Sequence, residues 1–328
     1  MQRLLQTAVT RQSPDLRIGI EVAQSAVKLA AVRRRAEGRT LERFLVEPLP
    51  HGAVVDGRIR NAEAVVEALR RLRVKSGLPR TEIVTALPDS AVQFKVLRVE
   101  RNLPARETMA LARREARTLI RDPQIPLAVD VASLGTAHID DELRDLLLVA
   151  AKTVDVRRHA ELFRRAGWQP TILEVDSMVA RHGIGHPMVH YDSGAPVVAV
   201  FDLGAGGIHL SVLRGDHPLF HRAQRWDPDQ VYVLTGPSSE SFIDTVRSLV
   251  QAFHRHTGIE HLDQLQVTGG LSLEAHWVTE LADWIGMPVE PWRAETVVQL
   301  GSSVQEINPL QLRSQAFVPL SLALRGFE

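Results

Sequence analysis

The sequence predicts an α/β protein of two domains, and three observations support this fold class. Short apolar runs of strand length alternate with longer stretches of helical periodicity. The 328 residues are enough for two domains of ordinary size. Placing Glu21 on Asp202 also aligns twelve residues of two strand–turn–strand patterns without a gap. A duplicated α/β unit produces such a repeat, although hairpins also resemble one another by chance.

The first domain is expected to open with three strands, a helix and a further buried strand. In chain order these elements cover residues 17–22, 26–34, 41–49, 61–78 and 81–88. Asn61 is a good N-cap for the helix. Apolar residues at helical spacing then give that helix one buried face, made of Val65, Val66, Leu69 and Leu72.

Residues 90–152 read as an inserted unit of strand, helix and two strands. The expected elements are 92–99, 105–120, 127–135 and 143–152. Its helix buries one set of apolar residues, Met109, Ala112, Ala116 and Leu119. It exposes a row of arginines, Arg106, Arg113, Arg114 and Arg117. A solvated surface is the simpler interpretation of that basic face.

A helix at 154–167, ending at Gly167, returns the chain to the first domain, and the turn-rich stretch 185–196 marks the domain boundary. The second domain is expected to contain a hairpin from residue 197, two helices and a strand. The helices carry Phe242, Val246, Leu249, Val250 and Phe253, and Trp277, Leu281, Trp284 and Ile285, while the strand covers 262–270. A last apolar helix at 317–326 closes the fold.

The expected domain organisation follows from these elements. It comprises an N-terminal extension (1–16), a first domain (17–89 and 153–190, with a C-terminal helix at 310–328 packing back onto it), an inserted subdomain (90–152) and a second domain (191–309).

Composition excludes several function classes. Lys and Arg balance Asp and Glu at 39 each, so net charge gives no case for nucleic-acid or membrane binding. The absence of cysteine excludes disulfides, thiolate metal sites and a cysteine nucleophile. No apolar stretch has the length of a signal-peptide core at the start or of a membrane span elsewhere. We therefore expect a cytoplasmic protein that reaches a membrane only through a partner.

The stretch "DLGAGG" at 202–207 has the composition of a phosphate-binding loop. Its glycines let the backbone approach an anion, and Asp202 could hold a metal-bound water. The alternative is the tight turn of an ordinary hairpin. Three histidines, His182, His186 and His190, have helical metal-site spacing, but Gly183, Gly185 and Pro187 break any helix there, so no metal site is expected.

The two hairpins, together with "VTGG" at 267–270, resemble the actin-like ATPase superfamily. Within it the chain resembles the PilM family of type IV pilus assembly proteins, which are FtsA-like. The resemblance rests on an ordered set of segments that begins near residue 17: "GIEVAQSAVKLAAV", "HGAVVDGRIRNAEAVVEALRRL", "LLLVAAKTVDVRRHAELFRRAGWQPTILEVDS", "VVAVFDLGA", "VTGG" and "LSLALRG". It implies an actin-like, FtsA-like fold of two duplicated ribonuclease-H-like domains with a small inserted subdomain.

The resemblance also implies a nucleotide site between the domains. Its candidate residues here are Glu21, Gln24, Ser25, Lys28, Asp202, Gly204, Ala205, Gly206, Gly207, Gly269 and Gly270. The family's usual "DIGSSSVK" is "EVAQSAVK" in this chain, and its Thr in the second loop is Ile208. We therefore expect ATP with Mg²⁺ to bind weakly or not at all, and efficient hydrolysis to be absent.

The family's partner is the cytoplasmic tail of PilN, and through it PilO and the pilus motor level, so the resemblance implies a protein at the inner membrane. In the family that tail lies in a groove between the first subdomain and the insertion, and the candidate contacts here are Phe94, Lys95, Val96, Leu97 and Arg98. Phe94 and Val96 could instead alternate into the insertion's own core. Two other functions stay open: an active ATPase or kinase on the same fold, and the equivalent adaptor of a type II secretion or related pilus system.

Overall fold

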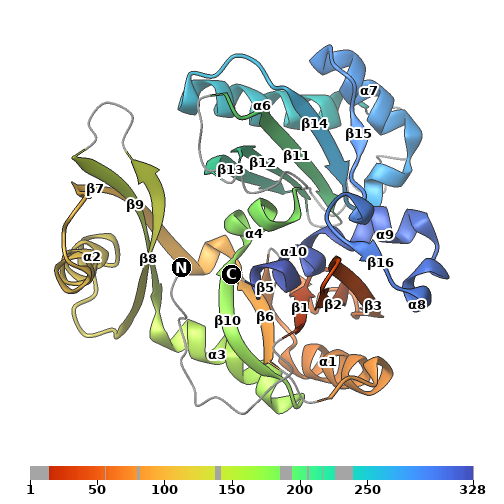
Figure 1. Ribbon diagram of the computed structural model, residues 1–328, viewed down its shortest axis with the longest axis horizontal. Coiled ribbons are helices and arrows are strands. Elements are labelled where there is room, and N and C mark those ends of the chain that lie inside the picture. Colours follow the sequence, from red (N-terminus) through yellow and green to blue (C-terminus); the bar gives the residue numbers. More distant parts are fainter. Residues whose placement is uncertain are drawn as a thin grey trace.

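The structure is a computed structural model. It describes residues 15–55, 57–79, 82–136, 142–184, 194–204, 207–215, 217–225 and 239–327. Two large sheets organise the chain, one above the other in Figure 1, and a third, smaller sheet stands to one side. The six-stranded sheet has the order β10-β6-β1-β2-β3-β16 and the five-stranded sheet has the order β13-β12-β11-β14-β15.

The six-stranded sheet is built mainly from the first half of the chain. Its strands are β1 (Leu16–Val22), β2 (Ala26–Arg35), β3 (Gly38–Pro48), β6 (Glu82–Leu87), β10 (Gln169–Val175) and β16 (Gln299–Leu300). Helices α1 (Ala62–Ser76) and α3 (Thr153–Arg165) cover its lower face in Figure 1. The side chain of Asn61 caps α1 by accepting from the Ala64 amide, as the sequence predicts. A short hairpin of β4 (Val54–Val55) and β5 (Arg58–Ile59) precedes α1.

The five-stranded sheet contains the second hairpin. Its strands are β11 (Val197–Gly204), β12 (Gly207–Arg214), β13 (His217–Arg225), β14 (Gln264–Thr268) and β15 (Glu290–Pro291). Helices α6 (Ser239–Thr257) and α7 (Ala275–Ile285) pack against it, and Phe242 and Trp277 lie with their rings 4.5 Å apart in the core. The Gly-Gly turn after β14 leads into a 3₁₀ turn, η3 (Gly270–Leu273), and α7 begins only after it.

Strand pairing supports the internal repeat. The hairpins β1–β2 and β11–β12 are both antiparallel. In each sheet the second strand of the hairpin pairs with an antiparallel strand, β3 or β13, and the first strand pairs with a parallel strand, β6 or β14. Glu21 pairs across its hairpin with Lys28, and Asp202 pairs across its own with His209. These four residues hold equivalent positions in the gapless alignment, so the two halves repeat one design.

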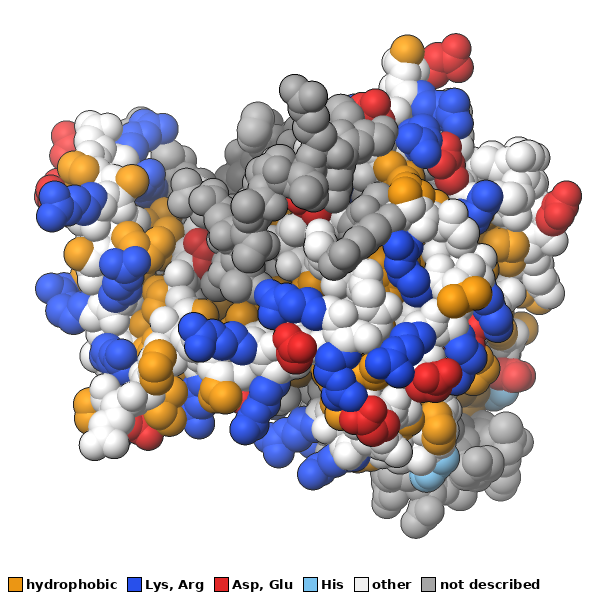
Figure 2. Space-filling view, turned by 90° about the horizontal axis from the view of Figure 1, so that it is seen from below, with side chains coloured by type: hydrophobic (Ala, Val, Ile, Leu, Met, Phe, Trp, Pro, Cys, Tyr) orange, Lys and Arg blue, Asp and Glu red, His pale blue; other side chains and the backbone are white. Residues whose placement is uncertain are grey.

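The inserted unit is the three-stranded sheet β7-β9-β8. Its strands are β7 (Val92–Glu100), β9 (Leu143–Lys152) and β8 (Leu127–Thr136), as the sequence predicts to within a residue. Helix α2 (Ala105–Leu119) covers one face and buries Ala112 and Ala116 there. Its arginines are exposed on the opposite side. Lys and Arg outnumber acidic side chains across the face of the molecule shown in Figure 2.

Two helices, α4 (Asp176–Gly183) and α10 (Phe317–Arg325), lie between the two large sheets (Figure 1). Two shorter helices, α8 (Ser302–Gln305) and α9 (Pro309–Gln315), lead into α10. The backbone of α10 crosses β1 so closely at Gly19 that a methyl group there would overlap Pro319 and Ala323. A buried ion pair joins Arg325 of α10 to Glu174 of β10, with an Nε–Oε2 distance of 2.8 Å. No helix of the described residues is long and apolar enough to cross a membrane.

Candidate functional site: a cavity between the two hairpins

The main candidate site is a cavity of about 400 Å³ between the two hairpins. Nine of the residues predicted for a nucleotide site line it: Glu21, Gln24, Ser25, Lys28, Asp202, Gly204, Gly207, Gly269 and Gly270. Ala205 and Gly206 lie outside the described residues. The structure therefore brings together residues that are up to 249 positions apart in the sequence.

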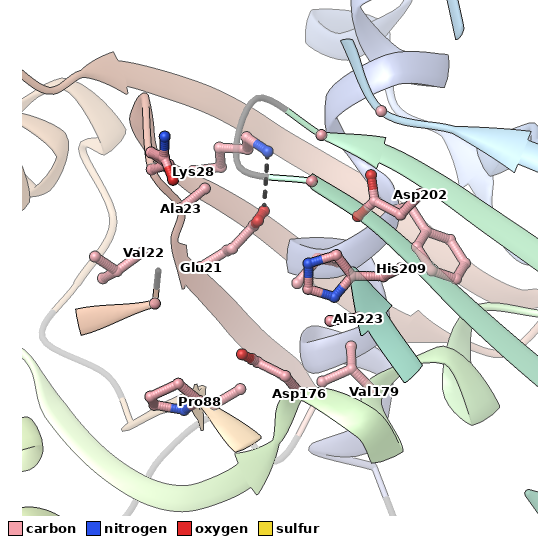
Figure 3. Close-up of a pocket in the computed structure, with 18 of the residues that line it drawn as sticks. Glu21, Val22, Ala23, Lys28, Pro88, Asp176, Val179, Asp202, His209 and Ala223 are labelled. Atoms are coloured by element: carbon pink, nitrogen blue, oxygen red, sulfur yellow. Dashed lines mark ion pairs between the residues drawn. The ribbon is translucent and has the colours of Figure 1, made fainter. Parts of the chain in front are cut away.

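Strand direction explains why acidic groups gather at the cavity. Strands β1, β6 and β10 are parallel neighbours, so their carboxyl ends meet at one edge of the sheet. Glu21 lies near the end of β1, Asp89 follows β6 and Asp176 follows β10. In the other sheet β11 and β14 are parallel, which brings Asp202 beside the turn at Gly269. Figure 3 shows Glu21, Asp176 and Asp202 around one space.

The first hairpin turn uses its own polar groups internally. The Lys28 ammonium lies 3.2 Å from a Glu21 carboxylate oxygen, and this ion pair is drawn as a dashed line in Figure 3. The Ala23 amide donates across the turn to the Ala26 carbonyl at 3.0 Å. A phosphate group in this turn would therefore have to compete with Glu21 for Lys28, and it would not receive the Ala23 N–H.

The Gly-Gly turn after β14 contains a glycine, Gly269, that packs against Asp202. Gly269 has φ = 91°, and a Cβ at this position would lie 2.5 Å from an Asp202 carboxylate oxygen and from the Leu203 backbone. Only glycine allows this approach and this backbone conformation. Asp202 is thereby held between its own strand and the Gly-Gly turn, facing the cavity.

Burial and mutual repulsion perturb the carboxyl groups. Burial raises the pKa of Glu21, Lys28 opposes that rise, and Asp202 adds to it. Burial also raises the pKa of Asp176 well above its usual value, and the charges of Asp89, Glu21 and Asp202 act in the same direction. The cavity therefore favours a cation, or an anion that arrives with one, over a bare phosphate.

A second polar group at the cavity joins the two halves of the chain. His221 of β13 lies with its Nε2 3.2 Å from an Asp89 carboxylate oxygen, and its Nδ1 lies 2.9 Å from the Ser211 hydroxyl. The Ser177 amide donates to the other Asp89 oxygen at 3.0 Å. Burial raises the pKa of Asp89, but the hydrogen bonds and charge of His221, with the Ser177 hydrogen bonds, outweigh it and leave that pKa below its usual value.

Sequence reasoning missed Asp89, Asp176, His209 and His221 as cavity residues. Asp176 stands in the "EVDS" segment that marks the family resemblance, and an acid directly after a buried strand was a usable signal. His209 is the position equivalent to Lys28 in the internal repeat, and burial lowers its pKa. Asp89 and His221 are far apart in the sequence, and only the sheet packing brings them together.

We tested whether the cavity residues fit Mg²⁺ and a nucleotide. No three His, Asp or Glu side chains of the described residues are grouped as a resident metal site would require. Mg²⁺ bound with a nucleotide usually takes only one or two carboxylates, however, and Asp202 and Glu21 both line the cavity. In the adjacent turn, Gly270 has open space where a side chain would lie, whereas Gly269 is packed against Asp202 and Leu203. The residues therefore fit a metal–nucleotide complex better than they fit free phosphate.

The five predicted partner-binding residues lie on β7 and divide between the two faces of the insertion. Lys95 is ion-paired with Glu115 of α2 at 2.8 Å, and Leu97 is buried against α2. Side chains alternate along a strand, so Phe94, Val96 and Arg98 lie on the other face. The side chain of Leu97 belongs to the insertion's own core. The assignment of the five residues to a partner site stays a prediction.

The remaining three residues belong to a partly open face. Phe94 is half-buried where the insertion packs against the first domain, and Val96 is 55% exposed beside the half-buried Leu147. Arg98 is held by Asp145 through two hydrogen bonds of 2.9 and 3.1 Å. We call the side chains of Phe94, Val96 and Leu147 the apolar row of the insertion.

The histidine spacing at 182–190 makes no metal site within the described residues. His182 is buried, and its Nε2 lies 3.6 Å from Glu174, close to Arg325. His186 and His190 lie outside the described residues.

Comparison with known proteins identifies relatives of this chain. The family model described as "Type IV pilus assembly protein PilM" matches residues 19–233. The solved structure of a "PilM-PilN type IV pilus biogenesis complex" matches with a TM-score of 0.73 at 24% identity, covering 95% of this chain and 98% of that one. The ethanolamine utilization protein EutJ from Carboxydothermus hydrogenoformans matches with a TM-score of 0.52 at 14% identity, covering 96% and 92%. The predicted two-domain, actin-like fold is confirmed.

Proposed function

Because the chain belongs to the PilM family of type IV pilus assembly proteins, we propose that it is an adaptor whose insertion binds the cytoplasmic tail of PilN. The similar solved structure is a complex of PilM with PilN, which supports this choice of partner. PilN would in turn connect the adaptor to PilO and to the pilus motor level. Attachment to the inner membrane would then depend on PilN.

The observation that carries the proposal is the apolar row on the insertion sheet. Among the described residues, few large hydrophobic side chains are more than a third exposed, and Val96 is one of them at 55%. It pairs across the ladder with Leu147, while Phe94 lies two residues along the same face. An extended segment laid on this face would remove these side chains from water, which stabilises binding by about 25 cal/mol per Å² of apolar surface.

Val96→Asp tests the proposal without disturbing a core. Val96 is more exposed than buried, so a charge there should leave the fold intact but place a carboxylate in the interface. The matched control is Val74→Asp on α1, since Val74 is 80% exposed and belongs to a different surface. The assay is fluorescence anisotropy of a labelled peptide with the sequence of the PilN tail from the same genome. We expect at least tenfold weaker binding for Val96→Asp and unchanged binding for the control.

Phe94→Asp should abolish binding, because Phe94 packs at the junction of insertion and first domain and is the largest member of the row. Circular dichroism must show that the variant is folded. Wild-type affinity in a folded Phe94→Asp protein would remove the apolar row from the binding site and would favour another surface.

A nucleotide bound in the cavity would modulate the adaptor. Asp202 and Glu21 would hold metal-bound water, and the turn at Gly269 and Gly270, whose backbone is open at Gly270, would lie against the adenosine. A bound nucleotide would supply phosphate charge, and Lys28 could contact that charge only by giving up its ion pair with Glu21. Because the turn at Ala23 satisfies its own N–H and Lys28 is already paired, we propose weak binding and no efficient hydrolysis.

An equilibrium titration with a fluorescent ATP analogue in Mg²⁺, competed with unlabelled ATP, tests this second proposal. Competable binding at micromolar to millimolar concentrations supports a nucleotide-responsive adaptor. Absence of competable binding at millimolar ATP would mean that the protein docks its partner without binding a nucleotide. Rapid turnover of ATP would instead favour the active ATPase of the same fold.

A further inference from the structure

Charge is distributed unevenly between the two domains, although the chain as a whole is balanced. Residues 1–190 carry 31 Lys and Arg against 23 Asp and Glu, whereas residues 191–309 carry 6 against 15. The first domain with its insertion is therefore basic, and the second domain is acidic. Net charge alone gives no case for an anionic surface as partner, but this separation of charge between two parts of one molecule does.

The lower face of the first domain, formed by α1 and α3, carries part of this positive charge. The second domain lies on the opposite side of the molecule in Figure 1, and Figure 2 looks onto the lower face. The two helices together contain eight Lys and Arg and four Asp and Glu. The basic side chains exposed on them are Arg70, Arg71, Lys75, Arg157, Arg158, Arg164 and Arg165.

Two of these arginines have no counter-charge within the protein. Arg71 and Lys75 of α1 share the buried carboxylate of Glu47. Arg157 and Arg158 of α3 are exposed, and within the described part of the chain neither side chain has an ion pair or a hydrogen bond. Guanidinium groups in this state are free to bind phosphate oxygens, for which their planar fork of donors is well suited.

Each of the two helices also exposes an apolar side chain beside its basic residues. Val74 of α1 is 80% exposed, the highest value among the large hydrophobic side chains of the described residues. It follows Arg70 and Arg71 by four and three positions, so the three side chains share the outer side of the helix. Val154 of α3 is 45% exposed and lies one turn before the two unpaired arginines. A bilayer surface matches both features, because it offers phosphate groups above an apolar layer.

We propose that the lower face of the first domain lies directly on the anionic headgroups of a bilayer. The arginines of α3 would bind lipid phosphates, and Val74 and Val154 would enter the boundary between headgroups and acyl chains. The same surface would repel the acidic second domain and so orient it away from the membrane. This contact goes beyond the adaptor function and does not depend on it. It would add to attachment through PilN, since two weak contacts with one membrane reinforce each other.

Co-sedimentation of the purified full-length protein with lipid vesicles tests the proposal without PilN. One set of vesicles is phosphatidylcholine alone, and the other contains about 30% phosphatidylglycerol as the anionic lipid. We expect binding to the anionic vesicles only. It should be lost when the salt concentration rises from about 0.05 M to about 0.5 M, because salt screens exposed charges.

Charge reversal on the lower face supplies the decisive variant. Arg157→Glu/Arg158→Glu should bind the anionic vesicles at least about tenfold more weakly than wild type. The matched control is Arg255→Glu/Arg293→Glu, which changes the net charge equally but on exposed residues of the second domain. The control should bind as wild type does. The proposal is overturned if wild-type protein does not bind the anionic vesicles, or if the two double variants bind them equally.

Two single variants separate this contact from docking of the tail. Val74→Asp should weaken vesicle binding and leave the affinity for the tail peptide unchanged, whereas Val96→Asp should do the reverse. Failure of the tail peptide to bind wild-type protein would refute the adaptor alone, and the vesicle assay would still decide the lipid contact. Salt-sensitive self-association without vesicle binding, lost in Arg157→Glu/Arg158→Glu, would assign the face to the acidic domain of a second copy and overturn the proposal.

Discussion

The ion pair of Arg325 and Glu174 provides a prediction whose size follows from the structure. The two side chains are 7% and 2% exposed, and the Nε–Oε2 distance is 2.8 Å. The second Glu174 oxygen accepts from the Val175 amide at 3.2 Å, and His182 lies near the first. Replacing Arg325 by Leu leaves a carboxylate deep between β10 and α10 without its guanidinium partner. Removing one partner of a buried pair costs about 3–5 kcal/mol.

Urea denaturation followed by circular dichroism measures this cost. With a slope of about 3 kcal/mol per M, the midpoint of unfolding should fall by about 1–2 M in Arg325→Leu. The double variant Glu174→Leu/Arg325→Leu should recover most of the loss, because replacing both charges by apolar groups is often neutral. A midpoint shift below about 0.3 M in Arg325→Leu, which is less than about 1 kcal/mol, would refute this reasoning.

Three further predictions concern the cavity and the first helix. Gly269→Ala should lower the urea midpoint and weaken any binding of the ATP analogue, because its methyl group would overlap the Asp202 carboxylate; unchanged values in both assays would contradict this. Asn61→Ala should destabilise the protein by about 1 kcal/mol and Asn61→Asp by much less, since only the alanine removes the N-cap acceptor; equal losses in urea would exclude a capping role. The pKa of Asp89 is lowered in the folded state, so the pairing of its carboxylate with His221 stabilises the fold at pH values above the unfolded pKa of about 3.9. This stabilisation is lost as the pH falls through the pKa of Asp89 in the folded state. The stability difference between wild type and Asp89→Asn should therefore shrink on acidification below pH 4, and a difference that stays constant would contradict the pairing.

Most regular elements were predictable because their patterns are local. The strands of the insertion carry continuous apolar runs, and the structure places β9 at the predicted residues 143–152. Helix α7 ends at Gly286 with φ = 76°, as the glycine after its last apolar turn indicates. The strand β13 was missed because its residues, "HPLFHRAQR", are half-buried or exposed and show no clean alternation. The two-residue strands β15 and β16 form only through tertiary pairing.

The candidate site was predictable where a motif marks it and not where packing creates it. The glycines and Asp202 follow from a loop composition that suits phosphate. By contrast, the contact of Asp89 with His221 depends on how the two sheets face each other. The five candidate residues of β7 come from the family's groove, and the structure divides them between the two faces of the strand. Strand alternation separates Leu97 from Val96, and this could have been inferred from the predicted strand alone.

Hydrogen–deuterium exchange of the full-length protein, with and without the PilN tail peptide, shows whether the partner docks on the insertion. The peptide should slow exchange in β7, β8 and β9 and leave exchange in the second hairpin, β11–β12, unchanged. Protection confined to the second hairpin, or no protection at saturating peptide, would contradict an adaptor that docks its partner on the insertion.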